Sequence, residues 1–172
     1  YFSKHNKIKI IKENLIDQIY KKKSVFHKPF FSIDDNIVGE SYKEKLLKIK
    51  KYLNKNNSDF IFITAPENVA WLLNIRGFDN PNSPIPNCHL LIDKKNNLYL
   101  ICEKKKAKKI IVEKKISEKR VIEFGNFEKL IKDLKGNKMI IDYKTCSLFF
   151  ENVLSKKFKI LKKEDPIYFL KS

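Results

Sequence analysis

The apolar residues between positions 41 and 56 repeat with the period of an α-helix. They stand three or four residues apart with lysines among them: Tyr42, Leu46, Ile49 and Leu53. This spacing predicts an amphipathic helix with a solvated lysine face that ends near Asn56. Ser41 and Glu44 have the spacing of a capping box, in which each side chain binds a backbone N–H at the helix start. The helix is therefore predicted to begin next to Ser41.

Short apolar runs alternate with helical patterns over the rest of the chain. Strands are predicted at residues 59–64, 88–93, 98–103, 121–124, 139–143 and 158–161. Helices are predicted at residues 67–74, 104–115, 127–134 and 147–156. Thr64 has the position of an N-cap for the first of these helices, with Pro66 in the first turn. Together these elements predict an α/β fold, a mixed β-sheet flanked by helices.

The front of the chain has a different pattern. Residues 7–12 alternate and predict a strand, and residues 14–20 predict a short helix. Residues 24–40 show little periodicity and are predicted to be a connecting loop or linker. Since the chain starts at Tyr1 and its only methionine is Met139, we expect a fragment of a longer protein. We expect residues 1–35 to be the remnant of a preceding domain plus a linker, and residues 36–172 to be one α/β domain.

The net charge first suggests an anionic partner. Lys+Arg number 37 against 20 Asp+Glu, which gives a formal charge of +17. However, only Arg76 and Arg120 are arginines, and arginine is the residue that reads phosphates and bases in a bidentate manner. Abundant Lys, Asn, Ile, Phe and Tyr indicate an AT-rich genome instead. We therefore expect no specific nucleic-acid partner; a basic binding module, supported by the run Lys104–Lys115, and a standalone scaffold domain stay open as alternatives.

Several function classes lack their sequence signals. No apolar stretch approaches the roughly 20 residues that cross a bilayer, and no signal peptide is visible. Cys88, Cys102 and Cys146 are odd in number and have no CxxC spacing, which favours a reducing cytoplasm. Cys88 precedes His89, but neighbours on a strand point to opposite faces. No phosphate-binding, HExxH or GxSxG motif is present. We expect no membrane, no metal ligand and no catalytic residue in this chain.

Residues 66–79 are the chemically distinctive segment. They contain Trp71, the only tryptophan, and Arg76, one of two arginines. In one interpretation Trp71 is an apolar wall of a binding rim, with Arg76 and Asp79 as its cation and anion. In the other, Trp71 belongs to the core and Arg76 forms a local ion pair with Asp79. The residues alone do not choose between the two.

The string AWLLNIRGFD at residues 70–79, preceded by DFIFITAPENV, resembles the non-catalytic domain before the peptidase domain of Xaa-Pro aminopeptidases. These are the aminopeptidase P members of the creatinase-like metallopeptidases. Three further strings are similar in the same order: residues 14–20, Gly39–Ser41 with Lys45, and Pro166–Lys171. The similarity covers about residues 8–172, although Tyr20 replaces a usual Trp and the 80–86 loop follows the family only loosely. It implies a creatinase N-terminal-domain-like fold.

The resemblance implies a role without a reaction for this chain. In that family two divalent ions, expected to be manganese, lie in a peptidase domain downstream, and none of their ligands maps onto these residues. The preceding domains limit access to small or unstructured proline-containing peptides and help to form homodimers. Trp71, Arg76 and Asp79 are then candidates for residues that line the substrate approach. We expect the fragment to be inactive alone, and the full-length enzyme to be cytoplasmic.

Overall fold

The computed structural model describes residue 11, residues 15–19 and residues 28–171. Helix α1 (Leu15–Ile19) agrees with the helix predicted at residues 14–20. Apart from residue 11, the strand predicted at residues 7–12 lies outside the described residues. No helix of the described part is long and apolar enough to cross a membrane.

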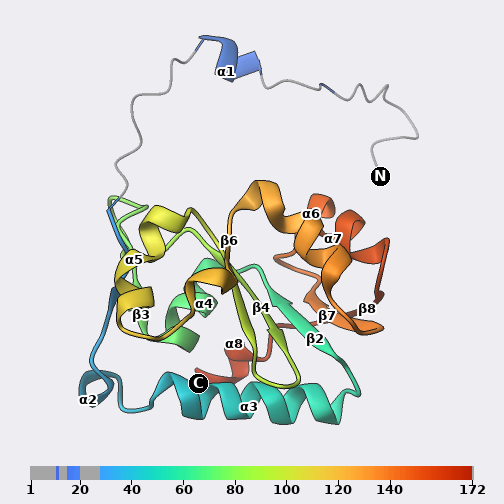
Figure 1. Cartoon of the computed structure of the whole chain (residues 1–172), viewed down its shortest axis with the longest axis horizontal. Coiled ribbons are helices and arrows are strands. Elements are labelled where there is room, and N and C mark those ends of the chain that lie inside the picture. The colour runs from blue at the N-terminus through green and yellow to red at the C-terminus, as the bar shows by residue number, and fades with distance from the viewer. Residues whose placement is uncertain (1–10, 12–14, 20–27, 172) are drawn as a thin grey trace.

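A six-stranded mixed sheet forms the centre of the domain, and its strand order is β6-β5-β4-β2-β7-β8 (Figure 1). Its strands are β2 (Phe60–Ile63), β4 (His89–Asp93), β5 (Leu98–Ile101), β6 (Val121–Ile122), β7 (Lys138–Asp142) and β8 (Lys159–Lys163). The pairs β2–β4 and β4–β5 are antiparallel. The pairs β2–β7, β7–β8 and β5–β6 are parallel. The predicted α/β fold with a mixed sheet is therefore confirmed.

Helices cover both faces of this sheet, because every central strand is apolar on both sides. In β2, Ile61 and Ile63 face one core and Phe60 and Phe62 face the other. Three longer helices and one short helix pack on the isoleucine face: α3 (Tyr42–Lys55), α4 (Pro66–Leu73), α5 (Lys104–Val112) and α8 (Ile167–Leu170). Two helices pack on the phenylalanine face: α6 (Phe127–Asp133) and α7 (Leu148–Ser155). Two 3-10 turns flank β6: η2 (Glu118–Arg120) and η3 (Phe124–Asn126).

The prediction that residues 24–40 are a connecting loop is wrong for residues 31–38. Strand β1 (Phe31–Ser32) pairs antiparallel with β3 (Ile75–Arg76), and α2 (Asp35–Val38) follows. Phe30, next to β1, is fully buried in the core of the domain. Elements of two to four residues are too short for a hydrophobic period to show, so their formation depends on partners distant in the sequence.

Of the two N-caps predicted from the sequence, the structure contains one. The capping box of Ser41 and Glu44 is present at the start of α3. Thr64 does not cap α4, because the N-cap is Ala65, which has no side-chain hydrogen bond. The Thr64 hydroxyl lies instead 2.8 Å from the hydroxyl of Thr145, in the loop after β7. Thr64 is buried at the end of β2, and its hydroxyl contacts the loop after β7 instead of capping α4.

Candidate functional site

The end of α4 brings Trp71 and Arg76 together. The helix ends at Asn74, whose φ of 51° and ψ of 48° lie in the left-handed region that Asn tolerates better than most residues. The chain reverses there and enters β3. As a result, Arg76 Nη1 donates to the carbonyls of Ile75 at 2.9 Å and Ala70 at 3.5 Å. The guanidinium of Arg76 therefore lies against the last turn of the helix that carries Trp71.

Trp71 is half-buried and packs against the core from its edge. The Nζ atom of Lys45, on α3, lies 4.1 Å from the centre of the Trp71 ring system and donates to the Trp71 carbonyl at 2.9 Å. Such a cation over an indole is an attractive contact. Burial lowers the pKa of the Lys45 ammonium from its usual value. Trp71 thus combines parts of both interpretations, because it contacts the core and keeps an accessible part.

Asp79 lies in a different environment. Its carboxylate pairs with Lys106 on α5 at 2.5 Å, and the two side chains are only 13% and 5% exposed. It also accepts a hydrogen bond from the backbone N–H of Asn87 at 2.6 Å. Among the described residues no ion pair joins Arg76 to Asp79, so that alternative is wrong. The structure therefore groups two of the three candidate residues, and Asp79 fastens the 79–87 loop to α5.

A partly buried polar network joins α4 to the segment around α8. Asn68 donates to Asp165 at 2.7 Å and accepts from the Lys171 ammonium at 2.5 Å. Tyr168 donates to the Glu67 carboxylate at 3.1 Å. Burial raises the pKa of the Asp165 carboxyl and lowers the pKa of the Lys171 ammonium. These contacts fix the last described helix against the helix that carries Trp71.

We define the α4–α8 face by five side chains: Glu67, Trp71, Arg76, Tyr168 and Lys171. Burial is the main cause that lowers the pKa values of Lys45 and Lys171, and the positive charge of Arg76 adds a smaller lowering to both. The face thus combines aromatic surface with two cations and one carboxylate. Such a surface can bind and orient a peptide or a neighbouring domain through hydrogen bonds and apolar contact.

Sequence reasoning missed Asn68, Asp165, Tyr168 and Lys171. Only Asp165 has a local signal, because Asp followed by Pro166 is typical of a helix start, and its Oδ1 does accept from the Ile167 N–H at 2.9 Å. The partner of Asn68 is 97 positions away in the sequence. Sequence patterns relate residues within one helix or strand, so they do not predict a contact between residues this far apart in the sequence.

His89 is half-buried among aromatic side chains. Its Nδ1 lies 2.9 Å from the Thr64 carbonyl, and its ring meets Phe62, Phe124 and Phe150 edge-on. Burial lowers the pKa of the imidazole. Within the part of the chain that the structure describes, no three His, Cys, Asp or Glu side chains converge in a way that could hold a metal ion. These residues do not fit the pair of ions that the family resemblance implies.

The fold is an α/β domain with a mixed sheet covered by helices on both faces, and the helix end that carries Trp71 and Arg76 lies beside α8. Residues 21–172 match the Creatinase/Prolidase N-terminal domain family. This match covers most of the chain, so the chain belongs to that family.

Relatives with curated names point to aminopeptidase P. The chain is 32% identical over 89 residues to a probable Xaa-Pro aminopeptidase P of Laccaria bicolor, which covers 48% of this chain and 13% of that protein. It is 32% identical over 85 residues to Xaa-Pro aminopeptidase 1 of Dictyostelium discoideum, which covers 42% of this chain and 13% of that protein. The expected resemblance is confirmed. The chain spans only a small part of the length of these relatives.

Solved structures share the fold. The X-prolyl aminopeptidase of Caenorhabditis elegans, described as a cytosolic enzyme with a di-nuclear active site, superposes with a TM-score of 0.68 at 16% identity, over 88% of this chain and 26% of that one. The aminopeptidase P of Streptococcus thermophilus superposes with a TM-score of 0.55 at 14% identity, over 76% of this chain and 98% of that one. At these identities the likeness shows the fold alone.

Proposed function

We propose that this chain is the non-catalytic N-terminal portion of an Xaa-Pro aminopeptidase, which releases an N-terminal residue that precedes proline. Membership of the creatinase/prolidase N-terminal family and the named relatives support this assignment. The full-length enzyme would carry a peptidase domain in the same chain. That domain would hold two divalent metal ions, expected to be manganese, which would activate water for attack on the peptide bond.

The observation that carries the role is the attachment of α8 to α4 beside Trp71 and Arg76. Pro166–Lys171 resembles the family's exit toward the peptidase domain, and the network through Asn68 and Lys171 fixes this exit on α4. The α4–α8 face would then border the peptidase domain. In that position it would shape the approach that substrate peptides take.

Each candidate residue has a distinct part in this proposal. The accessible part of Trp71 would offer an apolar wall to a proline ring, and the Arg76 guanidinium would donate to peptide carbonyls or a terminal carboxylate. Asp79 would act as a positioning residue, because its pair with Lys106 and its bond to Asn87 N–H hold the 79–87 loop. None of the three would touch the scissile bond.

Kinetics of the full-length enzyme test the role. Arg76→Ala should raise KM for Xaa-Pro peptides about tenfold with little change in kcat, because it removes a hydrogen bond from a charged group. Trp71→Ala should raise KM by about the same factor, because it removes apolar contact with the substrate. Lys119→Ala, an exposed cation remote from the α4–α8 face in sequence, is the control and should leave KM unchanged. Unchanged KM in both test variants, with unchanged melting temperatures, would contradict the proposal.

The proposal has three further parts. The enzyme would be a homodimer, and it would be located in the cytoplasm, as is the nematode enzyme described as cytosolic. The isolated chain would be inactive, since the metal-bearing domain supplies the chemistry. The boundary between residues 1–35 and 36–172 stays a prediction. The burial of Phe30 and the pairing of β1 indicate that residues 30–35 associate with the second unit.

A further inference from the structure

Two of the three cysteines stand opposite each other across the antiparallel pair of β4 and β5. The register of these strands joins His89 to Ile101. Because antiparallel partners run in opposite directions, the next position along both strands joins Cys88 to Cys102. Both side chains are fully buried. The fold therefore brings together two thiols that are separated in the sequence by a hairpin.

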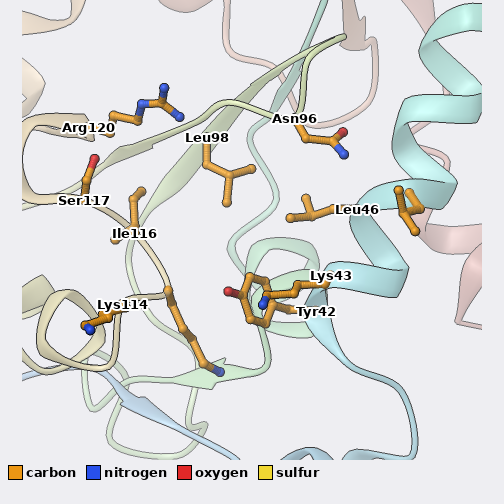
Figure 2. A pocket seen from close by; sticks show the side chains of 11 residues that line it. Tyr42, Lys43, Leu46, Asn96, Leu98, Lys114, Ile116, Ser117 and Arg120 are labelled. Atoms are coloured by element: carbon orange, nitrogen blue, oxygen red, sulfur yellow. The ribbon is translucent and has the colours of Figure 1, made fainter.

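The two cysteines also point to the same face of the sheet. Successive side chains of a strand alternate between faces, and even spacings share a face. Cys88 is two positions from Leu90, and Cys102 is four positions from Leu98. All four side chains belong to the core on the isoleucine face. Figure 2 shows Leu98 pointing from β5 toward the side on which Leu46 of α3 lies.

The hydrogen bonds of the hairpin define the geometry of the cysteine pair. The Asp93 N–H donates to the Asn97 carbonyl at 3.1 Å, so these two residues form a hydrogen-bonded pair. Hydrogen-bonded and non-hydrogen-bonded pairs alternate along an antiparallel ladder. Each cysteine lies five positions along its strand from that pair, so the cysteines occupy a non-hydrogen-bonded position. Cα atoms at such a position lie about 4.5 Å apart, and a disulfide needs a Cα separation of roughly 4.4–6.8 Å.

The third cysteine lies on the other side of the sheet. Cys146, between β7 and α7, is half-buried and packs against the core on the phenylalanine face. Burial raises the pKa of both the Cys88 and the Cys102 thiols, and the neighbouring Cys102 adds to the rise at Cys88. The geometry therefore selects one pair among the three cysteines.

We propose that Cys88 and Cys102 form a reversible disulfide by exchange with a low-molecular-weight disulfide such as glutathione disulfide. One cysteine thiolate attacks glutathione disulfide and releases one glutathione thiolate. The other cysteine thiolate then attacks the protein sulfur of the mixed disulfide and releases the second glutathione. The two cysteines lose two protons and two electrons, and glutathione disulfide is reduced to two thiols. Since both cysteines are buried, the exchange takes place during folding or when this end of the sheet opens.

The disulfide would fasten two segments that an ion pair already joins. Cys88 directly follows the 79–87 loop, and Cys102 precedes the start of α5 by two positions. Asp79, at the other end of the loop, pairs with Lys106 on α5. Oxidation therefore adds a covalent bond at the place where the loop is held to the helix by charge.

The redox equilibrium between the chain and glutathione tests the proposal. A disulfide that closes a loop of about 15 residues raises the folding equilibrium constant about 150-fold, because it restricts the unfolded chain. By thermodynamic linkage the folded state favours the disulfide by the same factor. The chain is unfolded in urea, mixed with reduced and oxidised glutathione, and equilibrated either in urea or after refolding. We expect an equilibrium constant for disulfide formation about 150-fold larger in the refolded chain, and a ratio below tenfold would overturn the proposal.

Peptide mapping of the refolded chain identifies the linked pair. Lys94 and Lys95 lie between the two cysteines, so trypsin separates the cysteines unless a disulfide joins them. Cys146→Ala is the matched control and should keep the native equilibrium constant, whereas Cys88→Ala should abolish the intramolecular disulfide. A linked peptide that contains Cys146, or an unchanged disulfide fraction in Cys88→Ala, would overturn the proposal. Should Cys88→Ala fail to fold, the linked peptides of the native chain still decide.

Discussion

The side chain of Asn74 joins the end of α4 to α3 and to the segment around α2. Its Oδ1 accepts from Lys45 Nζ at 2.6 Å, and its amide donates to the Glu40 carbonyl at 2.9 Å and to Asp35 Oδ1 at 3.1 Å. The residue is 1% exposed and adopts a left-handed backbone. Asn74→Ala therefore removes three hydrogen bonds and places a residue with a β-carbon and no local hydrogen bond at positive φ.

The expected loss of stability follows from these contacts. Removal of a hydrogen bond to a buried charged group, here the Lys45 ammonium, costs about 1.5–3 kcal/mol. The left-handed backbone costs Ala about 1 kcal/mol more than Asn. We therefore expect Asn74→Ala to lower the free energy of unfolding by about 2.5–4 kcal/mol. Asn74→Gly relieves the backbone and should lose about 1 kcal/mol less.

Urea unfolding of the chain, followed by circular dichroism, measures both effects. Asn57→Ala is the matched control, because Asn57 has a φ of 47° and is exposed, so it should lose only the backbone contribution of about 1 kcal/mol. The difference between Asn74→Ala and Asn57→Ala reports the hydrogen-bond network. Equal losses in the two variants would refute the reasoning that Asn74 joins α3 to the end of α4.

Asp79→Ala leaves the buried Lys106 ammonium with only the more distant and more exposed Glu103 carboxylate, at 3.7 Å, so we expect a loss of about 3 kcal/mol in urea unfolding, and a loss below about 1 kcal/mol would contradict the importance of the Asp79–Lys106 pair. Gly77→Ala places a β-carbon 2.6 Å from a Cα atom of the following loop and should cost about 1–3 kcal/mol, whereas Gly125→Ala, with open space around it, should cost less. Equal melting temperatures of these two variants would show that Gly77 is not tightly packed. Partial burial holds the pKa of the His89 imidazole below its usual 6.5. As the pH falls, the unfolded chain therefore binds the proton at a higher pH than the folded chain does. Stability present above pH 6.5 is then lost on acidification, and His89→Phe should reduce this loss between pH 7.5 and 5.5; an identical pH dependence would contradict the assignment.

The central strands and longer helices follow from sequence pattern, because each has four or more residues in a periodic environment. The run at residues 60–63 and the helix at residues 42–55 are in the structure within one or two positions of their predicted bounds. Elements defined by a distant partner were not predictable. Strand β1 is one example, since its two residues are strand only through their pairing with β3.

The candidate site was half predictable from composition. Trp71 and Arg76 stood out because they are rare in this chain, and the structure places them at the same helix end. Asp79 lies in the same sequence segment as Trp71 and Arg76, but its ion-pair partner Lys106 is 27 positions away and could not be predicted from that segment. Asn68 and Asn74 are two of many asparagines, and their roles depend on burial, which no local pattern encodes.

Hydrogen–deuterium exchange tests most directly whether the α4–α8 face borders a peptidase domain. The comparison is between the full-length enzyme and the chain described here. We predict that backbone amides of α8 and of the end of α4 exchange at least tenfold more slowly in the full-length enzyme, because contact with another domain suppresses local opening. Amides of α5, whose outer face is lysine-rich and exposed, should exchange at the same rate in both. Equal exchange of α8 in the two proteins, with new protection on α5, would contradict the account.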